Sequence, residues 1–210
     1  MPGRRRQKRT DRSKLDATPP WETRAREEIA ATTGPFDERD APDDDVERVD
    51  LGALRVPVVE GCDVRLDLDE NQQVMSATLA TAEGTMQLGV FAAPRNEGIW
   101  DDVRAEIAES MAGPRRTNAT ERDGPFGVEL HGTLPADGGG TVPVRFLGVD
   151  GPRWFLRALL AGPVATDAGK AALLEDALRQ VVVVRGGEPL PVREPVPLRL
   201  PEGIELPETS

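Results

Sequence analysis

Two arginine–aromatic motifs are the parts of this 210-residue sequence best suited to bind a ligand. One is Ala-Ala-Pro-Arg-x-x-Gly-x-Trp at residues 92–100, and the other is Gly-Pro-Arg-Trp-Phe-Leu-Arg at residues 151–157. Arginine binds planar anions through paired hydrogen bonds and also stacks on aromatic rings, so the motifs together could line an anion site. The candidate ligand-binding residues are Arg95, Trp100, Arg153, Trp154 and Arg157. The alternative is that the tryptophans belong to the core and the arginines extend past it to solvent.

The remaining reactive side chains form no catalytic or metal-binding pattern. His131 is the one histidine and lies on the polar side of an expected strand, and no Gly-x-Ser-x-Gly motif accompanies it. Cys62 is the one cysteine, which excludes an intramolecular disulfide and a cysteine-based metal site. The acidic stretch 67–78 lacks the Gly and Glu that an EF-hand loop requires. We therefore expect no catalytic residue, metal or cofactor, and lean against an enzyme.

The charge of the chain is unevenly distributed. The formal net charge is −11, yet residues 1–14 contain seven basic residues against one acid, Asp11. An acidic body argues against general nucleic-acid binding, because that needs clustered basic side chains. The basic arm remains a candidate for docking to phosphate of nucleic acid or anionic lipid, at about 1 kcal/mol per basic residue near an anionic membrane. The candidate residues are Arg4, Arg5, Arg6, Lys8 and Arg9. The alternative is a solvated tail.

Composition divides the chain into four parts. Residues 1–48 are expected to be a disordered charged arm, basic over 1–14, and an acidic run extends over 37–50. Residues 49–187 are expected to form a single α+β domain. The proline-rich residues 188–201 should lie extended against that domain, and 202–210 should be a disordered tail. No secretory or membrane-spanning segment is evident, and one cysteine suits a reducing compartment, so we expect a cytoplasmic protein.

The apolar pattern predicts two groups of strands, each followed by a helix. The first group is expected near residues 62–68, 74–82 and 85–93, and its helix follows Asn96 as N-cap. The second group begins at residues 124–135 and continues into a hairpin over 142–161. The residues between the first helix and this second group, which include Arg115, Arg116 and Arg122, are expected to be a solvated connector.

The hairpin is the clearest strand signal. A two-residue Asp150-Gly151 turn is predicted to place Leu147 opposite Trp154, with apolar residues on both faces. The second helix is predicted to begin at Thr166 and Asp167, and residues 181–187 form either its end or a short last strand. The fold class is thus α+β, with a largely antiparallel sheet of six to seven strands in the order β-β-β-α-β-β-β-α. Both helices are expected on one face of this sheet.

Several segments resemble an uncharacterised actinobacterial family known as domain of unknown function 3710. The two arginine–aromatic motifs carry the resemblance, together with the segments that follow. These are DLGALRVP, GPFGVEL, VRFLGVDGPRWFLRALLAG and VVVVRGGEPLPVREPVPLRLP. The likeness covers about residues 35 to 201. It implies a soluble cytoplasmic protein and supplies no activity, so no functional residue is transferred.

Three functions remain open. The first is a non-catalytic interaction or regulatory module with a protein partner, favoured by the missing catalytic pattern and the charged arm. The second is a domain that binds or converts a small anionic ligand in an Arg/Trp-lined concavity. The third is weak docking of residues 1–14 to nucleic acid or an anionic membrane. The sequence does not determine the oligomeric state. The first question for a structure is whether Arg95, Arg153 and Arg157 converge on one concavity.

Overall fold

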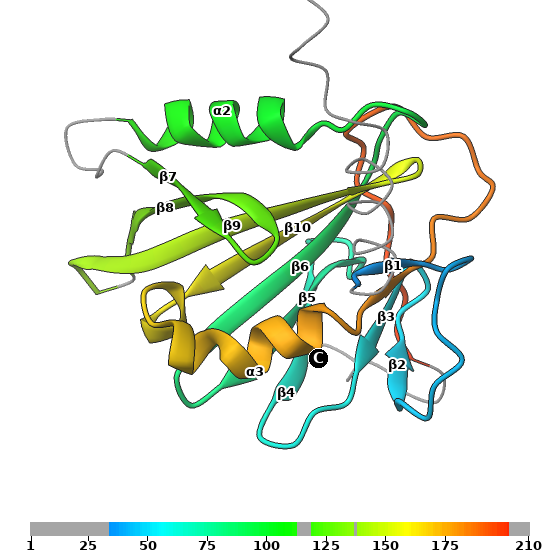
Figure 1. The fold of residues 1–210 in the computed structure, drawn as a ribbon, viewed down its shortest axis with the longest axis horizontal. Helices are drawn as coiled ribbons and strands as arrows, with labels where there is room; N and C mark the ends of the chain where they lie inside the picture. The colour runs from blue at the N-terminus through cyan, green and yellow to red at the C-terminus, as the bar shows by residue number, and fades with distance from the viewer. Residues whose placement is uncertain (1–33, 113–118, 137, 202–210) are drawn as a thin grey trace, which may run out of the picture. The chain divides into compact units, whose positions relative to one another are not determined.

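The computed structural model describes residues 34–112, 119–136 and 138–201, which contain two sheets and two α-helices (Figure 1). The larger sheet has seven strands. In spatial order they are β4 (Asp63–Leu68), β5 (Val74–Thr81), β6 (Gly84–Ala92), β10 (Trp154–Ala161), β9 (Thr141–Gly151), β8 (Gly127–Pro135) and β7 (Thr120–Gly124). The smaller sheet has the order β1 (Phe36–Asp37), β11 (Val182–Val183), β3 (Leu54–Pro57) and β2 (Arg48–Asp50). The helices are α2 (Trp100–Met111), α3 (Ala168–Leu178) and the short 3₁₀ helix η2 (Pro163–Ala165).

The predicted α+β class with a largely antiparallel sheet is confirmed. All neighbouring strands of the seven-stranded sheet are antiparallel, and the one parallel pair, β1 with β11, belongs to the smaller sheet. The second group has four strands rather than three, because β7 pairs with β8 where we expected a polar connector that included Arg122. Its charged side chains are exposed at the sheet edge, so no apolar alternation marks it as a strand.

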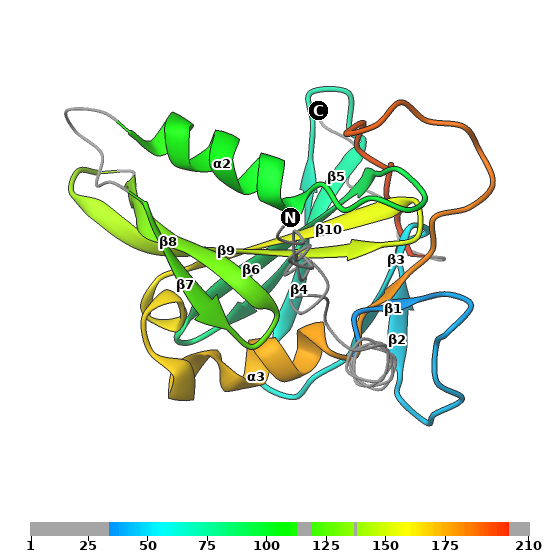
Figure 2. The ribbon, with the colours of Figure 1, turned by 45° about the horizontal axis from the view of Figure 1, so that its top comes forward.

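The two helices cover opposite faces of the large sheet, and the expectation of one shared face is wrong (Figure 1, Figure 2). The buried stripe of α3, with Leu174 and Leu178, packs in one core cluster beside Leu156. The stripe of α2, with Trp100 and Met111, packs in another beside Phe155. Since β10 alternates large apolar residues between its two faces, each face needs its own cover.

Residues 34–48 are part of the fold, which corrects the expected disordered arm in this region. The backbone N–H of Phe36 donates to Val181 O (2.9 Å), and that of Glu38 donates to Val183 O (3.0 Å). This pairing joins segments far apart in the chain, so local composition cannot indicate it. Arg4, Arg5, Arg6, Lys8 and Arg9 of the proposed docking arm lie outside the described residues, as does the tail 202–210.

The proline-rich segment 188–201 lies along the part of β6 that β5 does not reach. The backbone N–H groups of Arg193 and Val196 donate to Ala92 O (2.7 Å) and Val90 O (2.9 Å). Val196 and Leu198 are buried against the core. The non-proline residues of the segment thus supply hydrogen bonds that the prolines between them cannot donate.

The hairpin of β9 and β10 forms, but its turn lies two residues later than predicted. Trp154 pairs with Gly151, and Leu147 pairs with Ala158 instead of Trp154. The turn residues are Pro152 and Arg153, and Arg153 has a φ of 70°. Proline followed by a residue with positive φ is the arrangement of a type II turn. The predicted faces of the strands are unchanged, because the shift moves the turn by an even number of residues.

Candidate anion-binding site

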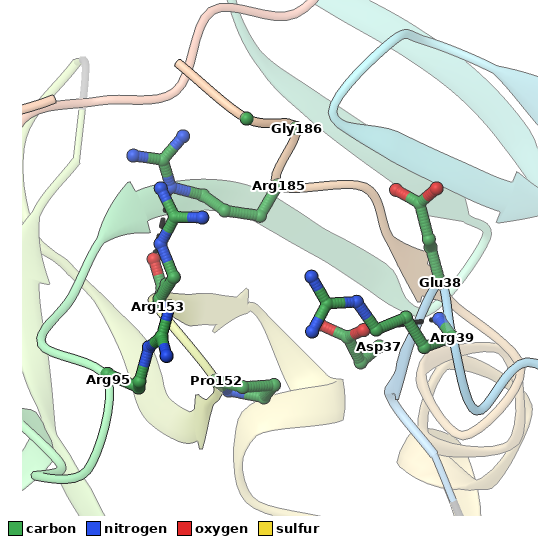
Figure 3. A pocket seen from close by; sticks show the side chains of 9 residues that line it. Asp37, Glu38, Arg39, Arg95, Pro152, Arg153, Arg185 and Gly186 are labelled. Atoms are coloured by element: carbon green, nitrogen blue, oxygen red, sulfur yellow. Dashed lines mark hydrogen bonds between the residues drawn. The ribbon is translucent and has the colours of Figure 1, made fainter. Parts of the chain in front are cut away.

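A pocket of about 420 Å³ opens where the hairpin turn, the loop before α2, strand β1 and the segment after β11 meet (Figure 3). Arg95 comes from the loop between β6 and α2, Arg153 from the hairpin turn, and Arg185 from the segment that follows β11. Figure 3 shows these three side chains in a row along one wall, with Asp37, Glu38 and Arg39 across the pocket. The remaining lining residues are Pro152, Gly186 and Gly187.

Asp150 fixes the loop that carries Arg95. Its carboxylate accepts the backbone N–H of Ile99 (2.8 Å) and of Trp100 (3.3 Å), so it caps α2 from strand β9. The predicted N-cap, Asn96, is therefore wrong: the cap position is Ile99, which has no capping side chain of its own. A carboxylate at a helix N-terminus also interacts favourably with the helix dipole. The use of Asp150 as a cap explains why an Asp-Gly pair does not form the hairpin turn.

Two glycines allow the start of α2 and strand β9 to pack closely against each other. A Cβ atom at Gly98 would lie 2.5 Å from the Asp150 carboxylate, and one at Gly148 would lie 2.2 Å from the Trp100 ring. Real side chains do not tolerate such distances. The two arginine–aromatic motifs are thus joined in one corner of the fold, and each presents an arginine to the pocket.

Trp154 holds a lining residue of the pocket, Asp37, in place. Its Nε1–H donates to Asp37 Oδ2 (2.8 Å), which ties strand β1 to the hairpin, and its side chain is buried in the core. The other Asp37 oxygen accepts the backbone N–H of Arg39 (3.1 Å). The Asp37 carboxylate is therefore already bonded through both oxygens, and Trp154 is a structural residue beneath the site.

The three arginines of the wall have no carboxylate partner. None of Arg95, Arg153 and Arg185 forms an ion pair with any residue that the structure describes. Arg185 is 9 % exposed, and its Nε–H donates to the carbonyl oxygen of Arg153 (3.1 Å). Burial lowers the pKa of Arg185, and the nearby positive charge of Arg153 lowers it further, whereas the negative charge of Glu188 partly opposes them. Three guanidinium groups thus lie close together here without a direct ion pair among the described residues.

The formal charge of the pocket is opposite to that of the chain. Four lining arginines, including Arg39, give +4, while Asp37 and Glu38 give −2, so the lining residues sum to +2. The whole chain carries −11. A concave site with this local field attracts anions.

The backbone of Arg153 is in an uncommon conformation. Its φ of 70° lies in the left-handed region, which costs a non-glycine residue about 1–2 kcal/mol. Glycine or asparagine ordinarily fills this position of a type II turn. An arginine at this position makes the turn less stable than glycine would, and it places a guanidinium group at the pocket.

The structure separates the five candidate residues of the sequence. Arg95 and Arg153 share the pocket, and Trp154 lies under it. Trp100 is the first residue of α2, and its side chain is buried between that helix and the sheet, where its Nε1–H donates to Val128 O (2.7 Å). Arg157 lies on the face of the sheet that α2 covers, with its guanidinium 5.1 Å from the Phe91 ring centre. Convergence of Arg153 and Arg157 on one concavity therefore does not occur.

Arg185 is the pocket residue that sequence reasoning missed. The signal available was an arginine followed by Gly-Gly at the end of the Val181–Val184 run. This combination places a long basic side chain beside a flexible turn, and Gly186 indeed has a φ of 67°. Nothing local indicates that the turn faces residues 95 and 153.

A cluster of one arginine and two glutamates is buried between β8, β9 and α3. Arg145 contacts Glu175 (Nη2–Oε1, 2.5 Å) and Glu129 (Nη1–Oε2, 3.5 Å). Glu129 is 2 % exposed, and burial raises its pKa to about 7 despite the lowering charge of Arg145. His131 Nε2 lies 3.4 Å from Glu129 Oε2, and burial lowers its pKa, as do the charges of Arg122 and Arg145. The polar strand face that we predicted around His131 is thus buried at Glu129, while the His131 side chain stays partly exposed.

Other candidate chemistry in the described residues is limited. Cys62 is partly buried against the core, and burial raises the pKa of its thiol, as does the charge of Asp63. No group of three or more metal-ligating side chains is found in the described ranges. Among the helices of those ranges, none combines the length and apolarity that crossing a membrane requires.

A family model described as "Protein of unknown function (DUF3710)" matches residues 34–206. The chain belongs to this family. No curated protein matches the DUF3710 chain. The description of the family names no activity.

Two solved structures are distantly similar to the DUF3710 chain. A Bacteroides thetaiotaomicron protein has 11 % identity and a TM-score of 0.42, with 66 % of this chain and 48 % of that one covered. The chain thus spans about half the length of that protein. LpqN of Mycobacterium tuberculosis, described as involved in cell envelope biogenesis, has 12 % identity and a TM-score of 0.31, with 72 % and 99 % covered.

Three segments on which the DUF3710 resemblance rests each supply one arginine to the pocket. Arg95 belongs to the segment that leads into α2, Arg153 to the hairpin, and Arg185 to the last apolar run. These segments are distant in the chain and meet only in the folded protein.

Proposed function

We propose that the protein is a non-catalytic regulatory module that binds a small phosphorylated metabolite in the pocket of Arg95, Arg153 and Arg185. One observation carries the proposal: three guanidinium groups line one wall and form no ion pair with the described residues. Holding like charges together is unfavourable unless an anion compensates them. A bound phosphate would remove this cost.

The pocket favours a dianion with a small organic part. The lining charge of +2 matches a phosphate monoester near neutral pH, which carries about −1.5 to −2. Guanidinium groups bind phosphate oxygens through paired, charge-assisted hydrogen bonds. A volume of about 420 Å³ lies within the range of small-molecule pockets and exceeds what a bare phosphate fills.

Binding rather than catalysis is proposed because of the side chains that line the pocket. The lining contains Asp, Glu, Arg, Pro and Gly, and no Ser, Thr, Cys, His or Lys that would act as nucleophile. Asp37 is hydrogen-bonded through both carboxylate oxygens, and Glu38 is exposed at the rim. The single Cys62 supports a reducing compartment as the location in which this binding occurs.

Thermal unfolding of the full-length chain with glycerol phosphate, phosphate and chloride at equal ionic strength tests the proposal. A ligand at about 100 times its Kd stabilises the folded state by about 2.7 kcal/mol, so glycerol phosphate should raise the melting temperature and chloride should not. Arg185→Met should lose this rise. Arg65→Met, at an exposed arginine outside the pocket, should keep it. Equal melting temperatures in all three salts would refute the proposal.

A regulatory module also needs a partner, and the basic arm is the candidate surface. Residues 1–14 lie outside the described residues, so this part rests on their charge. Deleting residues 2–14 should abolish any steeply salt-dependent affinity for nucleic acid, anionic vesicles or an acidic protein. Glycerol phosphate binding should persist in the truncated chain, which separates the two activities.

A further inference from the structure

A second cavity of about 160 Å³ lies between α2 and the large sheet, separate from the three-arginine pocket. Its lining is mainly apolar, with Phe91 of β6, Phe155 of β10, and Ile99 and Val103 around α2. Three charged residues complete it: Arg157, Glu106 and Arg193. The two cavities have no lining residue in common.

Arg157 is an unusual residue on this face of the sheet. It lies opposite Gly89 of β6 and Gly148 of β9, so neither neighbouring strand places a side chain beside it. Phe155 and Phe146, on the same face, belong to a buried apolar cluster. The Arg157 guanidinium lies over the Phe91 ring at 5.1 Å and forms no ion pair with a described residue. Burial lowers the pKa of Arg157.

The one carboxylate of the cavity is already paired. Glu106 Oε1 lies 2.5 Å from Arg193 Nη1, and Asp102 lies 3.6 Å from Arg193 Nη2. Arg193 belongs to the proline-rich segment and is fixed through its backbone N–H, which donates to Ala92 O (2.7 Å). The lining charges of +2 and −1 sum to +1, and Arg157 is the charge that remains without an acidic partner.

We propose that this cavity binds a small monocarboxylate with a ring-sized or branched apolar group. The carboxylate would pair with Arg157, and the apolar group would lie among Phe91, Val103 and Phe155. The size fits, because an apolar cavity of about 150 Å³ accommodates benzene. A single unpaired positive charge selects a monoanion, whereas the lining charge of +2 in the other pocket selects a dianion.

The affinity comes from two sources that can be tested separately. Pairing a half-buried guanidinium with a carboxylate contributes more than an exposed ion pair, because little water screens it. Burial of the apolar group removes the ring or branched chain from water. A ligand that lacks either part should bind weakly.

Methyl-resolved NMR of the full-length chain, titrated with benzoate, tests the proposal. The methyl groups of Ile99 and Val103 should shift in a saturable manner. Benzyl alcohol and acetate should each bind at least about tenfold more weakly, since each lacks one of the two contributions. Arg157→Met should weaken benzoate binding by a similar factor, while Arg65→Met should leave it unchanged.

Two further variants keep the result interpretable. Val103→Phe fills the cavity and retains Arg157, so it should also weaken benzoate binding by at least about tenfold. It replaces Arg157→Met if that variant does not fold. Arg185→Met should bind benzoate as the wild type does, because Arg185 lines only the other pocket among these two. Absence of saturable shifts in the wild type, or equal binding by Arg157→Met, would overturn the proposal. Loss of benzoate binding in Arg185→Met with retention in Arg157→Met would also overturn it.

Discussion

Two charged clusters of this protein differ in whether carboxylates form ion pairs with their arginines. Arg145 is buried and contacts both Glu129 and Glu175, and Glu175 also pairs with Arg179. Arg95, Arg153 and Arg185 line one wall of an open pocket and have no ion-pair partner in the described part of the chain. The first arrangement connects β8, β9 and α3 through ion pairs, whereas the second contains one hydrogen bond, from Arg185 Nε–H to the Arg153 carbonyl oxygen, and no ion pair among the described residues.

This difference separates a structural role from a binding role. A buried arginine with carboxylate partners is costly to remove, because its partners then stay buried and uncompensated. An arginine without a carboxylate partner has its charge available to a ligand. Substitutions in the two clusters should therefore affect different measurements.

The largest expected effect is on folding, from Arg145→Met. Removal of one partner of a buried ion pair costs about 3–5 kcal/mol. Here Glu129 and Glu175 both lose the Arg145 guanidinium, although Glu175 keeps a second contact with Arg179 at 3.7 Å. Arg185→Met removes one hydrogen bond and should change the free energy of unfolding by about 1 kcal/mol or less. Urea unfolding at pH 7.5 measures both values. Equal losses of stability in the two variants would contradict the assignment of a structural role to Arg145 and a binding role to Arg185.

A combined variant sharpens this prediction. Replacing the whole cluster, with Glu129→Gln, Arg145→Gln and Glu175→Gln together, removes all three charges at once. The combined variant should be more stable than Arg145→Met alone, because no uncompensated buried charge remains. If the combined variant is less stable than Arg145→Met, the remaining glutamate charges stabilise the folded state.

The next effect is the pH dependence caused by Glu129. Its pKa rises from 4.5 to about 7 on folding, so the folded state binds more protons than the unfolded state between these values. The free energy of unfolding should therefore fall as the pH rises from about 4.5 to 7, by about 3 kcal/mol at most, and then level off. Glu129→Gln should flatten this part of the curve, as measured by urea unfolding across the pH range. If Glu129→Gln leaves the pH dependence of the free energy of unfolding unchanged, a group other than Glu129 causes it.

A smaller effect with the opposite sign is expected for Arg153→Gly. Glycine adopts the φ of 70° without steric cost, so the variant should be more stable by up to about 1 kcal/mol. It should at the same time lose affinity for glycerol phosphate. Gain of stability with loss of binding distinguishes a binding residue from a structural one. A destabilised variant with normal affinity would show that Arg153 supports the turn.

The sequence predicts well those elements whose signal is periodic and local. The buried stripes of α2 and α3 follow from helical spacing, and the N-cap at Asp167 is confirmed by its bonds to the N–H groups of Gly169 and Lys170. The hairpin follows from two apolar runs, although Asp150 caps a distant helix and leaves the turn to Pro152 and Arg153.

What could not be predicted depends on contacts between distant segments. Strand β1 pairs with β11 at the other end of the domain, and Trp154 bonds to Asp37 of that strand. Arg185 joins Arg95 and Arg153 only because the smaller sheet brings β11 beside the hairpin. Glu129, Arg145 and Glu175 come from three elements, and none of their local patterns distinguishes a buried charge from a solvated one.

Isothermal titration of glycerol phosphate into the full-length wild type, Arg185→Met and Arg65→Met tests the central claim most directly. The wild type and Arg65→Met should bind at one site with the same affinity, and Arg185→Met should bind at least about tenfold more weakly, with its unliganded stability nearly unchanged. Equal affinity in all three proteins, or no saturable heat in the wild type, would contradict the claim that the unpaired arginines bind an anion.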